Sequence, residues 1–377
     1  MRPTVSLTSR TVRLRLTALV AALAATYIGI SGYIRSGIGT AAEDSTHSLQ
    51  AQLDGLKPGG VLRLTPQDYY HSGVLKVRVP DVHIDGNGAT LHATNDASSS
   101  VQLEAAGVRL TNIILTAPTQ GKRWSAREQH KLVMSGTGDS VQNVTIIGSA
   151  AAGIFVDGAQ DFSIRDVSVS HTRADGIHIT NGAARGVVQG VRTELTGDDA
   201  VAVVSYLADG HVCSDIRISG VTVEGTRWGR GISVVGGRGV SISDFAVSRT
   251  DSAGVYIASE GAPYFTASVD DVSVANGSIS RANTNPAVVQ GAVLVYSGNA
   301  MAVVQNVHMS NLRIAYTPAT AQRDVAIVTS AGGRVEGVSL RDFDITGSVA
   351  APLYSTAGTG AYVASGWSRN GLGIEVR

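Results

Sequence analysis

The sequence predicts an all-β fold, a right-handed parallel β-helix in which short strands stack as successive turns of one coil. Three observations predict it: a repeated strand pattern, a composition suited to tight turns, and the lack of amphipathic helical segments between the strands. The chain contains 44 glycines and is 43% hydrophobic but only 5% aromatic. Abundant Val and Ile favour strands, and frequent glycine favours the turns that join them.

A strand of alternating apolar residues recurs roughly every 23 residues in the middle of the chain, with two longer steps that indicate loop insertions. The paired apolar positions are Ile154/Val156, Ile177/Ile179, Val201/Val203, Ile232/Val234, Val255/Ile257 and Val293/Val295. A second alternating strand lies between these copies, often interrupted by Asn, Asp or Gly, as expected at a corner. One unit cannot bury its own apolar face. We therefore expect about ten stacked coils, with parallel strands ~4.8 Å apart around one core.

The alternatives to this fold are weaker. Without helices between the strands, a doubly wound α/β fold and a (β/α)₈ barrel are disfavoured. A β-sandwich is the runner-up, because alternation alone would also suit it. Residues 48–55 have helix-like spacing of Leu49 and Leu53, followed by Leu56. This predicts a short helix that covers the open N-terminal end of the core.

The first 43 residues differ from the rest of the chain. Four arginines precede an uncharged apolar run over 16–34, and a cleavage site is expected near 40–42. This pattern predicts a signal peptide or, since the run is long enough, an uncleaved N-terminal membrane anchor. Either outcome exports residues 44–377, which we interpret as one β-helix domain. We expect a secreted or cell-surface protein, in contact with the membrane only through this N-terminal segment.

Composition also limits the partners and cofactors. Formal net charge is zero and no basic run is present, which argues against nucleic acid. The one cysteine, Cys213, cannot form a disulfide within the chain or a thiolate cluster. The nine histidines show no zinc spacing. We therefore expect a monomer without a metal or organic cofactor.

Three acidic residues fall at one edge of the predicted coil. The residue before each strand start is Ala152, Asp175, Asp199, Arg230, Ala253 and Gly291 in successive units, and Asp198 precedes Asp199. In a stacked coil these positions form one column, about 4.8 Å per step. Like charges this close raise the pKa of at least one carboxyl, and the arginine lowers that of a neighbour. Such a split suits an acid and a base acting on a glycosidic bond.

A purely structural role competes with this interpretation. Aspartate before glycine commonly caps a turn through its own side chain, and Arg230 could serve to neutralise Asp199. Three aligned acids favour chemistry. Around them, His178 and Tyr256 are predicted to point outward, while Trp228 and Tyr206 flank the column. Sugar rings stack on aromatic faces, and histidine can exchange protons. Inserted loops at 120–131, 206–215 and 260–268 would wall the site.

The segments 173–176 (Arg-Ala-Asp-Gly) and 197–199 (Gly-Asp-Asp) carry a resemblance. From about residue 46 onward the chain resembles the pectin-lyase-like superfamily, and its centre resembles the polygalacturonases, which are inverting glycoside hydrolases. The chain departs from that family at 229–231, Gly-Arg-Gly where a histidine is expected, and at 255–257, Val-Tyr-Ile where Arg-Ile-Lys is expected. The resemblance implies polysaccharide hydrolysis, with Asp198 or Asp199 as the acid and Asp175 sharing the base role.

Two other classes of function stay open. Carboxylates bind Ca²⁺, and Arg230 beside them could act as a base for β-elimination from a uronic acid. That would make the protein a polysaccharide lyase or an epimerase. The remaining class is a noncatalytic β-helix that binds glycans or serves as a structural surface protein.

Overall fold

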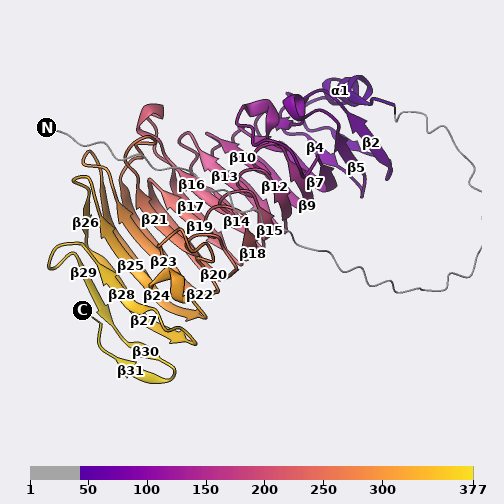
Figure 1. Cartoon of the computed structure of the whole chain (residues 1–377). Coiled ribbons are helices and arrows are strands. Elements are labelled where there is room, and N and C mark those ends of the chain that lie inside the picture. Colours follow the sequence, from indigo (N-terminus) through magenta and orange to yellow (C-terminus); the bar gives the residue numbers. More distant parts are fainter. Residues whose placement is uncertain (1–42, 377) are drawn as a thin grey trace, which may run out of the picture. The chain divides into compact units, whose positions relative to one another are not determined.

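The computed structural model describes residues 43–376, so the predicted signal peptide or anchor lies outside the described residues. The described chain winds into a parallel β-helix whose strands follow one another along a single axis (Figure 1). Helix α1 (Thr46–Asp54) sits at the N-terminal end of the coil. Its Leu49 and Leu53 are buried in the same core cluster as Leu75 and Val77 of the first coil. The predicted capping helix is confirmed. No helix among residues 43–376 is long and apolar enough to cross a bilayer.

One face of the coil is an eleven-stranded parallel sheet with one strand per turn, in agreement with the expected ten or so coils. Its strands are β3 (Leu75–Val77), β6 (Val101–Leu103), β8 (Leu132–Met134), β10 (Ile154–Asp157), β13 (Ile177–Thr180), β16 (Val201–Val204), β19 (Ile232–Val235), β21 (Val255–Ser259), β23 (Val293–Ser297), β25 (Arg323–Thr329) and β28 (Ala351–Ser355). We call this the short-strand sheet.

A twenty-stranded sheet forms the rest of the wall and bends at a corner in each turn. Its strands are β1 (Val61–Arg63), β2 (Asp68–His71), β4 (His83–Asp85), β5 (Thr90–Ala93), β7 (Arg109–Thr116), β9 (Ser140–Ser149), β11 (Ser163–Arg165), β12 (Ser168–Thr172), β14 (Val187–Gln189), β15 (Arg192–Thr196), β17 (Ser214–Ser219), β18 (Thr222–Thr226), β20 (Gly237–Ser248), β22 (Val269–Ser280), β24 (Val303–Ala315), β26 (Arg334–Glu336), β27 (Val338–Thr346), β29 (Tyr362–Ser365), β30 (Trp367–Arg369) and β31 (Leu372–Ile374). Four 3₁₀ turns lie in the loops: η1 (Asp96–Ser98), η2 (Arg127–Gln129), η3 (Leu207–Asp209) and η4 (Ala319–Ala321).

The core follows the predicted register. Ile154 pairs with Ile177, which pairs with Val201, and the same column continues through the later coils. These side chains are fully buried. Burying each one contributes roughly 1.5–3 kcal/mol relative to exposure, before the entropy of ordering the chain. Because every turn adds apolar side chains at equivalent positions, the core is one continuous column.

The corner of the twenty-stranded sheet is a second column, built from residues with left-handed backbone. We call it the corner column. Its members in successive turns are Asn112, Asn143, Asp166, Gly190, Gly220, Asp244, Asn276, Asn311, Asp342 and Gly366, all with positive φ. Asparagine, aspartate and glycine tolerate this conformation better than other residues do. Side-chain bonds link neighbouring turns, such as Asn143 Nδ2 to Asn112 Oδ1 at 2.8 Å.

Candidate functional site

The predicted acidic column exists at the entrance to the short-strand sheet. The register of β13, β16 and β19 puts Asp175, Asp199 and Arg230 at equivalent positions in three successive turns. Backbone bonds connect these turns, with Gly176 N donating to Asp199 O at 2.9 Å and Ala200 N donating to Arg230 O at 3.0 Å. Stacking therefore brings together acids that lie more than twenty residues apart in sequence.

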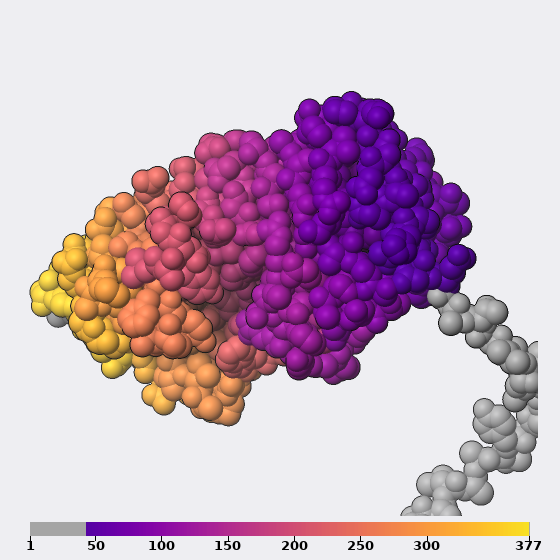
Figure 2. All heavy atoms as spheres, turned by 90° about the horizontal axis from the view of Figure 1, so that it is seen from above, coloured from indigo at the N-terminus to yellow at the C-terminus, as the bar shows by residue number. Residues whose placement is uncertain are grey.

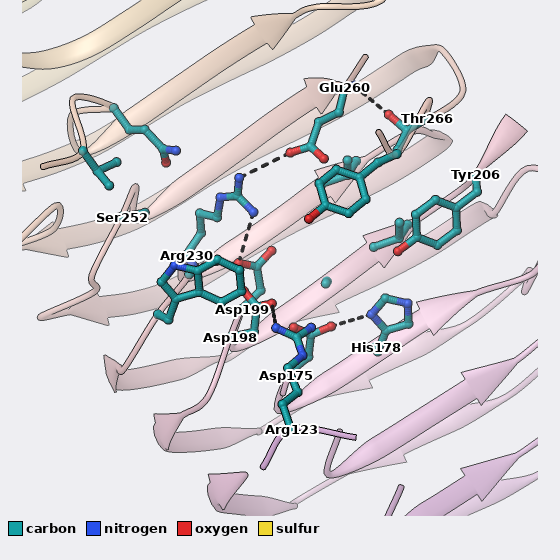
Figure 3. A pocket seen from close by; sticks show the side chains of 18 residues that line it. Arg123, Asp175, His178, Asp198, Asp199, Tyr206, Arg230, Ser252, Glu260 and Thr266 are labelled. Carbon is teal, nitrogen blue, oxygen red and sulfur yellow. Dashed lines mark hydrogen bonds and ion pairs between the residues drawn. The ribbon is translucent and has the colours of Figure 1, made fainter. Parts of the chain in front are cut away.

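Each of the three carboxylates has a different partner (Figure 3). Asp175 Oδ2 lies 2.5 Å from His178 Nδ1. Asp199 Oδ2 accepts from Ser233 Oγ at 2.5 Å, and its Oδ1 accepts from the backbone N–H of Arg230 at 2.7 Å. These two donors fix the orientation of the Asp199 side chain.

Asp198 is the carboxyl with the perturbed pKa. Its Oδ2 contacts Arg123 Nη1 at 2.5 Å. Burial, and after it the negative charges of Asp199 and Asp175, raise the pKa of Asp198 to about 7, while Arg123 opposes the shift. A carboxyl with this pKa is protonated in a substantial fraction of molecules near neutral pH, beside two other acids. The raised pKa of one carboxyl is what the sequence led us to expect from acids placed this close together.

Close backbone approach around Asp198 requires glycine in the next turn. Gly229 has φ of 123°, and a Cβ at this position would lie 2.4 Å from Asp198 Oδ1. A side chain here would push Asp198 out of its place. Where the polygalacturonase pattern leads us to expect a histidine, the chain has Arg230, which directly follows this tight turn.

Arg230 is held between acids and an aromatic ring. Its guanidinium lies 3.7 Å from Asp199 and 3.3 Å from Glu260, over the ring of Tyr256 at 4.3 Å from the centroid. Burial alone would lower the pKa of Arg230, but the nearby negative groups, Asp199 foremost, raise it above its usual value. Arg230 therefore stays protonated and serves as a fixed positive charge.

The hollow over the acids arises from side-chain size along one outward-facing column. In successive turns this column contains Phe155, His178, Ala202, Ser233, Tyr256 and Leu294. The two small residues in the middle leave space that the larger ones on either side fill. The resulting pocket has a volume of about 360 Å³, and Ala202 lies in its lining. We call it the acid pocket. Figure 2 shows the surface hollowed where the magenta and salmon parts of the chain meet.

Loops from several turns wall the acid pocket, as predicted. Arg123 reaches it from the first insertion, Tyr206 from the second, and Glu260 and Tyr264 from the third. The second and third insertions are joined, since Leu207 N donates to Phe265 O at 2.9 Å. Val288 and Gln290, from a loop that the sequence did not single out, complete the lining.

The structure brings together Asp175, Asp198, Asp199, His178, Tyr206, Trp228 and Arg230 in this lining. It corrects the prediction for Tyr256, whose side chain is buried at 3% exposure beneath Arg230, where it donates a hydrogen bond to Glu260. Tyr256 points outward from the strand, but its large ring is covered by the arginine that the acids attract. Tyr256 therefore supports Arg230 and has no free face for a sugar.

Sequence reasoning missed Arg123 and Ser233 as direct partners of the acids, and Glu260 as a partner of Arg230. The insertion around Arg123 was visible, but nothing local indicates that its guanidinium reaches Asp198, 75 positions away. Among residues 43–376, no group of three or more His, Cys, Asp or Glu side chains is arranged to bind a metal ion.

Comparison with known proteins places the coil in a known class. A family profile described as "Right handed beta helix region" matches residues 130–336. No curated protein sequence matches the chain.

Solved structures similar to this chain include glucanases and a mannuronan epimerase. The catalytic unit of a GH87 α-1,3-glucanase from Streptomyces thermodiastaticus superposes with a TM-score of 0.62 at 18% identity, covering 88% of this chain and 67% of that one. A GH87 α-1,3-glucanase variant in complex with tetrasaccharides gives 0.68 at 13% identity, covering 87% and 68%. The mannuronan C-5 epimerase AlgE4 A-module of Azotobacter vinelandii gives 0.56 at 14% identity, covering 86% and 98%. At these identities the likeness extends to the fold, and the chain spans about two thirds of the glucanase lengths.

Proposed function

The chain belongs to the right-handed β-helix family, and from this premise we propose that it is a glycoside hydrolase that cleaves a neutral polysaccharide in the acid pocket. The observation that carries the proposal is the pKa of Asp198, raised to about 7 by burial and by the two neighbouring acids. A protonated carboxyl beside two further acidic side chains, open to a pocket, suits glycosidic bond cleavage.

In the proposed reaction, Asp198 donates its proton to the glycosidic oxygen as the bond between that oxygen and the anomeric carbon breaks. A water molecule attacks the anomeric carbon and gives a proton to Asp175, which His178 holds at 2.5 Å. Asp199, fixed by Ser233 and the backbone of Arg230, contributes negative charge that stabilises the oxocarbenium-like transition state. Acid and base are both side chains of the pocket, so the reaction needs no metal ion.

The spacing of the acids has a counterpart in the glucanases. Variants of a GH87 α-1,3-glucanase with single aspartate-to-alanine substitutions are bound to tetrasaccharides or nigerose. The substituted aspartates are an adjacent pair and one 23 residues before the pair, the step that separates Asp175 from Asp198. This agreement supports assigning chemistry to all three acids.

The charges of the acid pocket favour a neutral sugar over a uronic acid. Both arginines in its lining are already paired, Arg123 with Asp198 and Arg230 with Asp199 and Glu260. A uronate carboxylate would meet these acids without an unpaired cation among the described lining residues, which opposes binding. Polygalacturonate, the substrate implied by the sequence resemblance, is thus a weaker candidate than a neutral glycan.

A lyase or epimerase is the second candidate, since the fold is shared with a mannuronan C-5 epimerase. Its mechanism would need a base near the sugar. The raised pKa of Arg230 counts against that residue as the base, because losing its proton would leave Asp199 and Glu260 without their counter-charge. We rank this candidate below hydrolysis.

We also propose that the protein acts outside the cytoplasmic membrane. The support is the basic and apolar pattern of residues 1–43, typical of a signal peptide or anchor. An export assay tests this by comparing the full chain with a variant that lacks residues 1–43. Equal amounts of the two proteins outside the cytoplasmic membrane would contradict the proposal.

The function is tested with the purified full-length protein on neutral glucans, galactans, polygalacturonate and alginate, with and without Ca²⁺. New reducing ends without unsaturated products are expected on a neutral polysaccharide. Asp198→Asn should lower the rate about 10²–10⁴-fold. The matched control is Asp244→Asn in the corner column, where asparagine tolerates the same backbone.

Other results would replace the proposal. Unsaturated products indicate a lyase, and epimerised sugar without cleavage indicates an epimerase. Binding without any chemical change indicates a glycan-binding protein, and the absence of binding indicates a structural role. NMR of the released anomer then distinguishes inversion from retention, and so water activation by Asp175 from nucleophilic attack.

A further inference from the structure

We propose that a depression on the N-terminal side of the acid pocket is a second sugar subsite, which binds the neighbouring unit of the same polysaccharide chain. The inference rests on the proposed function, because it extends the same groove. The depression has a volume of about 400 Å³ and is lined by Trp124, His130, Phe155, Asp157, Thr180 and Asn181, among others. It shares Arg123, Asp175, His178 and Tyr206 with the acid pocket, so the two hollows are continuous.

The floor of the depression is a ladder of three rings that run along the coil axis. Phe155 lies between His130, at 4.1 Å between centroids, and His178, at 5.4 Å, and in both pairs the ring planes are nearly parallel. Because the rings cover one another's faces, their edges remain for a ligand. Ring edges are electropositive and attract oxygen atoms rather than cations. A floor of this kind suits the hydroxyl and ring oxygens of a sugar.

Unpaired polar groups gather in the walls. Of the eleven buried side-chain polar atoms that lack a hydrogen-bond partner within residues 43–376, three belong to this lining: Trp124 Nε1, His130 Nε2 and Thr180 Oγ1. A buried polar group without a partner costs about 1–3 kcal/mol. Such a concentration in one hollow is explained if a ligand supplies the partners after a small side-chain shift.

The chemistry of these groups defines the ligand. Burial lowers the pKa of His130 to about 3, so its ring is neutral. Its Nδ1 accepts from Ala152 N at 3.0 Å, which leaves the proton on Nε2 as a donor. Trp124 Nε1 is also a donor, and Thr180 Oγ1 can donate or accept. Donors of this kind match sugar hydroxyl oxygens.

Charge excludes an anionic ligand here as well. Asp157, Asp175 and Asp209 are part of the lining. The cation near Asp157 is Arg127, which is already paired with it and with Ser135. The second subsite therefore takes the same class of ligand as the acid pocket, a neutral glycosyl unit.

The wall that carries Trp124 is anchored to the coil before any ligand binds. Arg173, which is almost fully buried, pairs with both carboxylate oxygens of Asp96 at 2.6 and 2.9 Å. It also donates to the carbonyls of Pro118 at 2.8 Å and Lys122 at 3.1 Å. Trp124 N donates to Ala150 O at 2.9 Å. A wall fixed in this way loses little conformational entropy on binding.

The experiment measures affinity apart from catalysis. Full-length Asp198→Asn protein is titrated by calorimetry with oligosaccharides of increasing length, prepared from the polysaccharide that the wild type cleaves. Into this background we introduce Thr180→Val, which removes the hydroxyl and keeps the shape, and, separately, Trp124→Phe, which removes the indole N–H and keeps an aromatic ring. The matched control is Thr193→Val, which removes another buried and unpartnered hydroxyl that lies in the core away from the depression.

Each of the two subsite variants should bind long oligosaccharides about 5–10-fold more weakly, with little change for a disaccharide that fills only the acid pocket. Thr193→Val should leave all affinities unchanged. Equal affinity of the subsite variants and the control for long oligosaccharides, with wild-type cleavage intact, overturns the subsite alone. If the wild type cleaves nothing and Asp198→Asn binds nothing, the proposed function fails and the subsite fails with it.

Discussion

Two polar columns run along this β-helix, and they have opposite properties. The corner column stacks asparagine, aspartate and glycine where the twenty-stranded sheet bends. The column at the start of the short-strand sheet stacks Asp175, Asp199 and Arg230. Both repeat once per turn, and both contain aspartate. From sequence spacing alone, the two columns are alike as rows of aligned residues that include aspartates.

Burial and neighbours separate the two columns. In the corner column, Asn311 bonds to Asn276 at 2.8 Å at the exposed edge of the coil, and left-handed backbone explains the choice of residue. At the strand starts, Asp199 is buried, and Asp198 beside it has a raised pKa and borders a pocket. Stacking aligns side chains in either place. The acid pocket lies where small side chains leave the coil hollowed and inserted loops wall it.

The largest expected effect is on activity, when the same aspartate-to-asparagine substitution is made in each of the two columns. Asp199→Asn should lower kcat/KM by about 10²–10⁴-fold, because an amide places a neutral group where Ser233 and the backbone of Arg230 bind a carboxylate. Asp166→Asn, the same change in the corner column, should leave activity unaltered. Steady-state release of reducing ends measures both. Wild-type activity of Asp199→Asn would make the strand-start column structural as well.

The next largest effect is on stability, when a buried ion pair and an exposed ion pair are each broken. Arg173→Met should destabilise the protein by about 3 kcal/mol, because it leaves Asp96 and two carbonyl groups without their donor. Arg185→Met, which breaks the fully exposed pair with Asp161, should leave stability unchanged within error. Urea unfolding measures the difference. In Arg173→Met, trypsin should also cleave faster at Lys122 and Arg123, and equal cleavage rates would show that another contact fixes this loop.

The pH dependence tests the environment of Asp198. A general acid acts in its protonated form, so activity should fall as the pH rises through about 7, about tenfold per pH unit. Arg123 favours the ionised form and lowers the pKa of Asp198, so Arg123→Gln should raise that pKa and move the alkaline limb to higher pH. Arg123→Lys is the control that keeps the charge. A limb that stays in place in Arg123→Gln would assign the titration to another group.

The smallest effect tests the corner column as a structural device. Asn311→Ala should destabilise the protein by about 1–2 kcal/mol, because alanine is strained at a φ of 53°. Asn311→Gly should cost less, since glycine adopts this backbone without strain. Thermal unfolding compares the two variants, and cleavage activity should be normal in both. If glycine is the more damaging, the bond to Asn276 matters more than the backbone conformation.

The sequence by itself determined the coil, its core and the acid column. Alternation with a period of two is a local property, and a repeat of nearly constant length, apart from its insertions, stacks each strand on its copy. The pairing of Ile177 with Val201, and hence of Asp175 with Asp199, follows from counting residues. The corner residues could also be predicted from the sequence, because the preference for Asn, Asp or Gly at each corner depends only on the local backbone conformation.

Only the tertiary structure decided what surrounds the acids. Arg123 reaches Asp198 from an insertion without a repeat, and that insertion is held by Arg173 and Asp96, 77 positions apart. Tyr256 has the outward register of a surface residue but is buried, because the charge of the acids draws Arg230 across its ring. Periodicity fixes the positions of backbone atoms in a coil. The contacts of long side chains and inserted loops depend on packing and charge between distant turns, which no local pattern encodes.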